Sequence, residues 1–156
     1  MGRIVLILIL VGVHIFFDFP TGSYMVRAVS YSFFHANWWH LAVNSIAILS
    51  IYKTYKPCRD LIIPFLIAVL VYPLSFRPVI GFSNILYATL GMRTPKLSSP
   101  WWKQTSVIVF IVITILMLFI PRFSATTHIA SFLLGMLGSS INRFIQSTLN
   151  DARRYL

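Results

Sequence analysis

The sequence predicts an all-helical membrane protein built from six spanning helices. Two features of composition carry this prediction: 58% of the 156 residues are hydrophobic, and only 10% are charged. The mean hydropathy of +0.81 is far above that of a soluble domain. A spanning helix needs about 20 mainly apolar residues. Six spans would therefore leave only short connections, and we expect residues 1–156 to form a single domain.

Apolar runs and helix breakers divide the chain into the six expected spans. The first run begins with the basic Arg3, as a signal peptide does, but no small-x-small cleavage pattern follows it and further spans come later. We therefore interpret it as an uncleaved helix. Hydropathy and breakers place the spans at residues 4–17, 34–52, 61–76, 83–92, 105–120 and 126–145.

The distribution of charge predicts the orientation of these spans. Ten of the thirteen cations fall on the side of the termini, and three fall on the other side. By the positive-inside rule both termini are expected to be cytoplasmic, with the chain in a cell membrane, either plasma or inner. The net charge of +10 then reflects orientation and contact with anionic lipid, and no nucleic-acid partner is expected. The three outer cations are Arg27, Arg77 and Arg122.

The fourth expected span is half the usual length. Residues 83–92 would form a helix about 15 Å long, whereas the hydrocarbon core is about 30 Å thick. If this helix ends at the cytoplasmic face near Arg93, it begins near mid-membrane, and residues 76–82 enter the bilayer as irregular backbone. Such backbone is tolerated only where protein or a water-filled cavity surrounds it. The sequence therefore predicts a cavity near Ser83.

Four polar residues are expected to meet beside that cavity. The second, fourth and sixth spans run from outside to inside, and His40, Asn44, Ser83 and His128 all lie early in them. Taken singly, a membrane histidine or serine is more often structural, and His40 with Asn44 could serve as interhelical contacts. Because intramembrane polar groups are costly, their convergence nevertheless predicts a functional site.

Ser83 and His128 are the parts needed for nucleophilic acyl transfer. A serine hydroxyl becomes a nucleophile when a neutral imidazole within hydrogen-bond distance accepts its proton. The chain has no glutamate, and its three aspartates map to span ends or loops, so the sequence predicts a dyad. Backbone N–H groups at the start of the fourth span, with His40 and Asn44 as side-chain donors, could stabilise an oxyanion.

Small residues are expected to bring the two helices of the dyad together. Ser131, Gly135 and Gly138 follow His128 on one helix face, and Gly91 lies on the fourth span. Such stripes allow transmembrane backbones to approach each other closely. The sequence therefore predicts tight packing of the fourth span on the sixth.

The motifs together resemble the rhomboid family of intramembrane serine proteases in its minimal six-helix form. HANWWHLAVN resembles the second-helix signature of that family, which implies oxyanion-side roles for His40 and Asn44 and a supporting role for His35. In VRAVSYSFFH, Arg27 resembles the arginine of the first-loop W-R motif, which implies that it braces the first loop, residues 18–33. The resemblance implies a six-transmembrane-helix bundle whose short fourth helix starts near mid-membrane.

Two further motifs carry the implied catalytic roles. GFSNILYATLG resembles the G-x-S-G-x-x-x-Y/F helix start, which implies Ser83 as nucleophile and Tyr87 as the ring packed against the catalytic histidine. HIASFLLGMLG resembles the H-x-x-G-x-x-x-G stretch, which implies His128 as base. Asn84 replaces the second glycine of the first motif and could either add an oxyanion donor or crowd the substrate.

Smaller departures from the family pattern flank these motifs. Ser131 replaces the first glycine after the histidine, Thr127 replaces the alanine commonly found before it, and Val26 stands where the family prefers tryptophan. These changes bear more on activity than on fold.

The resemblance implies an intramembrane serine endopeptidase that cleaves the transmembrane segments of other membrane proteins. Its expected partners are those substrates and membrane lipids, and it needs no cofactor and no metal. One alternative is a catalytically inactive rhomboid-like pseudoprotease that binds client helices, favoured by Asn84 and opposed by the intact serine and histidine. Another is a membrane haem protein, opposed because no helix carries two histidines at the spacing that two stacked haems require. Its axial ligands would come from His14, His35, His40 and His128.

Overall fold

The computed structural model describes residues 2–18, 22–51, 61–75, 80–94, 112, 115 and 124–154. All the regular elements in these ranges are helical, which confirms the predicted all-helical class for this part of the chain. The fifth expected span, residues 105–120, lies outside the described residues apart from Val112 and Ile115. Seven of the thirteen cations used for the orientation also lie outside them: Lys53, Lys56, Arg59, Arg77, Lys96, Lys103 and Arg122.

Helices occur where the sequence predicts the other five spans. Within residues 18–33, where the sequence predicts a loop, the structure also has a short helix and a 3-10 turn. No helix in the described ranges is both long and apolar enough to cross a membrane. The elements in chain order are α1 (Gly2–Phe16), α2 (Tyr24–Ser30), η1 (Tyr31–Phe33), α3 (Trp38–Ile51), α5 (Ile62–Val71), η2 (Tyr72–Leu74), α6 (Ser83–Arg93) and α8 (Ala125–Arg154).

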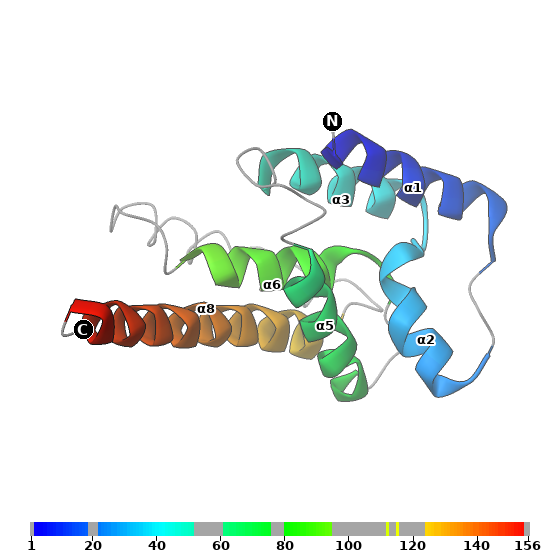
Figure 1. Cartoon of the computed structure of the whole chain (residues 1–156). Helices are drawn as coiled ribbons and strands as arrows, with labels where there is room; N and C mark the ends of the chain where they lie inside the picture. Colours follow the sequence, from blue (N-terminus) through cyan, green and yellow to red (C-terminus); the bar gives the residue numbers. More distant parts are fainter. Residues whose placement is uncertain are drawn as a thin grey trace.

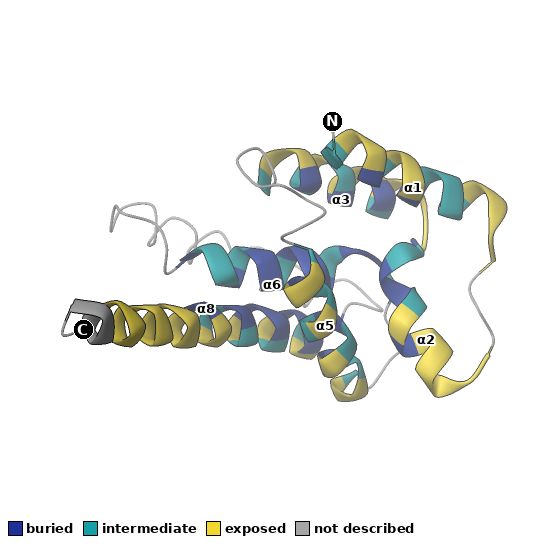
Figure 2. Ribbon diagram, in the orientation of Figure 1, coloured by how far each residue is buried: buried dark blue, intermediate teal, exposed yellow. Residues whose placement is uncertain are grey.

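The short helix α6 is the centre of the described structure. It packs against α3, α5 and α8, and α1 packs against α3 (Figure 1). Helices α3, α6 and α8 run in the same direction in Figure 1, so their N-terminal ends share one side of the molecule. Most residues of α6 are buried, as Figure 2 shows, whereas the C-terminal half of α8 is exposed.

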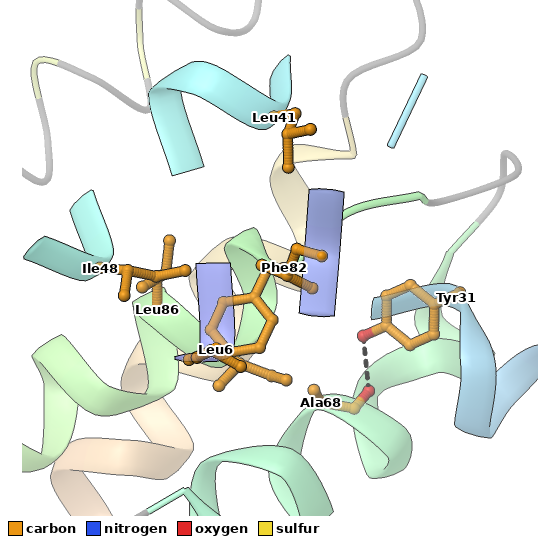
Figure 3. Packing of buried hydrophobic residues seen from close by; sticks show 9 residues of the cluster. Leu6, Tyr31, Leu41, Ile48, Ala68, Phe82 and Leu86 are labelled. Atoms are coloured by element: carbon orange, nitrogen blue, oxygen red, sulfur yellow. Dashed lines mark hydrogen bonds between the residues drawn. The ribbon is translucent and has the colours of Figure 1, made fainter. Parts of the chain in front are cut away.

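Apolar side chains form the core and also cover the outer helix faces. Tyr31, Ile48 and Ala68 in the core are fully buried (Figure 3), whereas Leu66 and Leu70 on the outer face of α5 are more than half exposed. Helices that are apolar on all sides are typical of proteins that face lipid. The core cluster comprises Leu6, Leu10, Tyr31, Leu41, Ile48, Ala68, Phe82, Ile85 and Leu86.

Polar contacts hold both ends of α3. At its N-terminus Asn37 Oδ1 accepts a hydrogen bond from the His40 N–H at 2.8 Å, which caps the first turn. At its C-terminus the carbonyl of Leu49 accepts from Arg3 Nη1 at 3.0 Å, and the carbonyl of Ile51 accepts from Arg93. Cations are favourable at helix C-termini because of the helix dipole. These contacts tie α3 to α1 and α6.

Two glycines allow the backbones of α6 and α8 to touch. A Cβ atom placed on Gly91 would lie 2.0 Å from the carbonyl oxygen of Phe132, and one on Gly135 would lie 2.2 Å from that of Ala88. Both distances are too short for any side chain. Gly138, by contrast, would meet nothing in the described part of the chain within 4 Å. The predicted small-residue stripe thus forms the contact at Gly135 but not at Gly138.

Candidate active site

The packing of α6 on α8 places a serine and a histidine in direct contact. Ser83 is the first residue of α6, and His128 lies in the first turn of α8. The distance between Ser83 Oγ and His128 Nε2 is 2.7 Å, which is a hydrogen bond. His128 is buried, with 2% of its surface exposed, whereas Ser83 is partly exposed. A partly exposed serine therefore contacts an imidazole that the helices enclose.

The other nitrogen of the imidazole fixes which atom can accept a proton. His128 Nδ1 lies 2.6 Å from the carbonyl oxygen of Ser124. Because a carbonyl oxygen only accepts, Nδ1 must carry the hydrogen and donate it. In the neutral ring Nε2 is then unprotonated, so it accepts the hydrogen bond from the Ser83 hydroxyl. This is the tautomer that a general base for Ser83 requires.

An aromatic ring holds the imidazole from the side. Tyr87, one helical turn after Ser83 on α6, meets His128 edge to face, with ring centroids 4.7 Å apart and an interplanar angle of 79°. This is a favoured geometry for neighbouring rings. The contact limits rotation of the imidazole and keeps Nε2 directed at Ser83.

His40 and Asn44 lie against the backbone that leads into Ser83. Gly81 has φ +124°. A Cβ atom on it would lie 2.4 Å from His40 Cε1 and 3.4 Å from Asn44 Nδ2. Both side chains of α3 therefore reach the chain two residues before Ser83. This is the side on which the first N–H groups of α6 have no intrahelical acceptor.

Replacing Gly81 with alanine tests this close approach. We expect Gly81→Ala to destabilise the protein by about 2 kcal/mol, because the side chain meets the His40 ring and strains a left-handed backbone. Thermal unfolding in detergent measures the change. Gly12→Ala is the matched control, since a Cβ on Gly12 meets nothing described within 4 Å. Equal unfolding midpoints for the two variants would contradict the contact.

His35 lies beside this pair and orients Asn44. Asn44 Nδ2 donates to His35 Nε2 at 3.0 Å, and both side chains are buried. The rings of His35 and His40 meet edge to face, with centroids 5.2 Å apart. The structure thus brings together six of the sequence-predicted site residues: His35, His40, Asn44, Ser83, Tyr87 and His128. The described ranges contain no group of three or more His, Cys, Asp or Glu side chains that could hold a metal ion.

The protein-family model of the Rhomboid domain matches residues 22–142 of the chain. That match covers more than half of the chain and includes every residue of the site described above. The chain belongs to the rhomboid family. Comparison with curated proteins gave no match, and comparison with solved structures gave none either. As a rhomboid, the chain is a membrane protein.

The side chain of Asn84, the residue after Ser83, points in a different direction from the one expected. Its Nδ2 atom donates to the hydroxyl of Tyr31 at 2.9 Å, and the whole side chain is buried. The expectation that Asn84 adds an oxyanion donor or crowds the substrate is therefore at odds with its contacts. The amide points into the protein, toward the first loop.

The structure describes no hydrogen bond from the remaining expected residues to the side chain of Ser83 or His128. Arg27 is exposed on α2, and Val26 beside it is also exposed. Ser131 is fully buried on α8, one turn after His128. Thr127 donates its hydroxyl to the Ser124 carbonyl at 3.0 Å. The Ser124 carbonyl therefore accepts hydrogen bonds from both the Thr127 hydroxyl and the His128 ring.

Two groups that contact the site residues do not follow from the sequence pattern: the Ser124 carbonyl, which contacts His128, and Tyr31, which contacts Asn84. The Ser124 carbonyl is a backbone atom, so a search for acidic partners of histidine cannot find it, although its place four residues before His128 in a helix start was a usable signal. Tyr31 was missed because a tyrosine in a loop carries no motif. The one sequence feature that points to a role for Tyr31 near the site is its position four residues before His35.

Proposed function

We propose that this rhomboid is an active intramembrane serine endopeptidase, with Ser83 as nucleophile and His128 as general base. The observation that carries the proposal is the 2.7 Å hydrogen bond between Ser83 Oγ and His128 Nε2. The Nδ1–H donation to Ser124 adds to it, because the neutral ring is then unprotonated at Nε2, the atom that contacts Ser83. Ser83 and His128 lie on separate helices, so their contact depends on the packing of α6 against α8 and does not follow from proximity in the sequence.

The first half of the reaction forms an acyl-enzyme. Ser83 Oγ attacks the carbonyl carbon of the scissile peptide while its proton moves to His128 Nε2. The negative charge on the former carbonyl oxygen is stabilised by N–H groups of the first turn of α6, assisted by His40 and Asn44. The C–N bond then breaks, and the Nε2 proton passes to the leaving amine.

The second half returns the enzyme to its starting state. Water attacks the acyl carbon and gives its proton to His128 Nε2, and the same N–H groups stabilise the second oxyanion. When the bond to Ser83 Oγ breaks, the proton on Nε2 returns to that oxygen. The Ser124 carbonyl stabilises the imidazolium in both halves, because its bond to Nδ1–H strengthens when the ring is charged.

The proposed setting is a cell membrane, plasma or inner, crossed six times with both termini in the cytoplasm. The ten-to-three distribution of cations supports this orientation. The shared direction of α3, α6 and α8 agrees with spans that alternate in direction, because the N-terminal ends of these three helices lie on one side (Figure 1). Substrates are transmembrane segments of other proteins, which enter laterally past the second and fifth spans and partly unwind. Small side chains near the cut and helix-weakening residues favour cleavage.

A fluorophosphonate probe tests the nucleophile directly. We expect the purified wild-type protein to be labelled covalently and Ser83→Ala to be unlabelled, because the oxygen of an activated serine displaces fluoride from the probe and becomes phosphonylated. Mass spectrometry of the labelled peptide locates the adduct. Ser45→Ala serves as a control, since Ser45 Oγ donates to its own helix at Leu41 and should not react. Equal labelling of wild type and Ser83→Ala would remove the assignment.

Cleavage of a co-reconstituted single-span reporter separates the protease from the pseudoprotease alternative. An active protease cuts the reporter, whereas a pseudoprotease binds it without cutting. The inward direction of Asn84 leaves Ser83 partly exposed to a substrate, which supports the protease.

A further inference from the structure

Tyr31 contacts the chain on both sides of Ser83. On one side, the N–H of Gly81 donates to the backbone carbonyl of Tyr31 at 3.0 Å. On the other, Asn84 Nδ2 donates to the Tyr31 hydroxyl at 2.9 Å. A single residue of η1 therefore holds positions 81 and 84, which enclose the nucleophile.

The hydroxyl of Tyr31 is itself anchored to another helix. It donates to the carbonyl oxygen of Ala68 on α5 at 2.8 Å, the contact drawn in Figure 3. Tyr31, Asn84 and Ala68 all have 0% of their surface exposed. Hydrogen bonds between fully buried groups cannot be replaced by bonds to bulk water, so breaking one leaves its partner unpaired. The path from α6 through Tyr31 to α5 is therefore a rigid one.

The Asn84 amide has no alternative anchor in the described part of the chain. Its Oδ1 atom is buried there without a hydrogen-bond partner. The bond from Nδ2 to Tyr31 is thus the contact that fixes the direction of this side chain. Because Asn84 is the second residue of α6, a change in its direction moves the first turn, which carries Ser83 and the N–H groups nearest to it.

We propose that Tyr31 and Asn84 are positioning residues for the reaction: together they set the orientation of the first turn of α6 relative to His128 and to the His40 and Asn44 pair. This inference rests on the proposed protease function and deepens it. Tyr31 and Asn84 do not touch the reacting atoms; they act through Ser83 and Gly81. The first loop thereby controls the nucleophile through one tyrosine.

The test compares kinetic constants with stability. Tyr31→Phe removes only the hydroxyl and leaves the ring and the backbone carbonyl in place. We expect the maximal rate of labelling by a fluorophosphonate probe, and kcat for a single-span reporter, to fall about tenfold, while KM and the probe's half-saturation concentration stay within about twofold. Tyr72→Phe is the matched control: its ring lies 4.9 Å from that of Tyr31, and it makes the same chemical change. We expect wild-type constants for it.

The double variant Tyr31→Phe with Asn84→Ala separates a shared role from two independent ones. In Tyr31→Phe the Asn84 amide loses the hydroxyl that accepts its hydrogen bond, and the double variant removes that unpaired amide as well. We therefore expect the kcat of the double variant to be no lower than that of Tyr31→Phe alone. If the losses of kcat caused by the two single substitutions multiplied in the double variant, the shared role of Tyr31 and Asn84 would be overturned. An unchanged kcat in Tyr31→Phe would overturn it too. A lowered unfolding midpoint with an unchanged kcat per folded molecule would show a structural role only and would also overturn it. A wild type that neither labels nor cleaves instead removes the proposed function and, with it, this role.

Discussion

Replacing His128 with alanine is expected to slow reporter cleavage by about 10³-fold. A positioned general base contributes roughly 10²–10⁴-fold to such reactions, and no other base contacts Ser83 Oγ in the residues that the structure describes. The loss should appear in kcat, because the imidazole acts on the proton of Ser83 and not on substrate binding. Reporter cleavage at saturating substrate, in detergent or liposomes, measures it.

The size of this loss depends on the Ser124 carbonyl. Many serine hydrolases use a carboxylate to orient the base, whereas here the acceptor for Nδ1–H is a peptide oxygen at 2.6 Å. A carbonyl fixes the tautomer as a carboxylate does, but it carries no full charge to stabilise the imidazolium. The Ser124 carbonyl therefore orients the His128 ring well but stabilises its charged form less than a carboxylate would.

A second variant separates loss of the base from loss of packing. His128→Gln keeps a polar side chain of similar length beside the Tyr87 ring but cannot serve as a base near neutral pH. We expect it to be as inactive as His128→Ala and to unfold closer to the wild-type temperature. Cleavage within tenfold of wild type in either variant would exclude His128 as the base.

The start of α6 shows how much the sequence could predict. Hydropathy and the flanking breakers placed the fourth helix at residue 83, where the structure also begins it. Its short length followed from counting residues against the bilayer thickness. Spacing along the second, fourth and sixth spans then predicted that His40, Ser83 and His128 would share one end of the bundle. These features depend on the order and direction of the helices, and the pattern of hydropathy along the sequence is enough to predict both.

The contacts that depend on backbone geometry could not be predicted in this way. The sequence places Ser124 four residues before His128, but only the folded helix start directs its carbonyl at Nδ1. The same holds for Tyr31: helix α2 and the turn η1 lie where the sequence predicted only a loop, and they carry the tyrosine to α5 and α6. Asn84 was assigned to the oxyanion side because its neighbour is Ser83, yet adjacent residues on a helix face different directions.

Replacing Gly135 with alanine is expected to have the largest effect on stability among these variants and to slow the reaction as well. A Cβ at this position would lie 2.2 Å from the carbonyl oxygen of Ala88 and 3.1 Å from the Met92 nitrogen. Both are backbone atoms of α6, so no side-chain rotation relieves the collision and the helices must separate. Overpacking of this kind costs about 3 kcal/mol. Thermal unfolding in detergent measures that loss.

The catalytic consequence follows from the same displacement. Separation of α6 from α8 lengthens the 2.7 Å hydrogen bond between Ser83 and His128, since the two residues lie on these two helices. A shift of about 1 Å at a reacting centre can cost about 10²-fold in rate. We therefore expect the folded fraction of Gly135→Ala to be labelled by a fluorophosphonate probe about 10²-fold more slowly than wild type.

Gly138 provides the matched control one turn further along α8. A Cβ there meets nothing described within 4 Å, and alanine is the better helix former, by up to about 1 kcal/mol. Gly138→Ala should therefore unfold at or above the wild-type temperature and label at the wild-type rate. If Gly135→Ala behaved in the same way, the backbone contact between α6 and α8 could not be what holds the serine against the histidine.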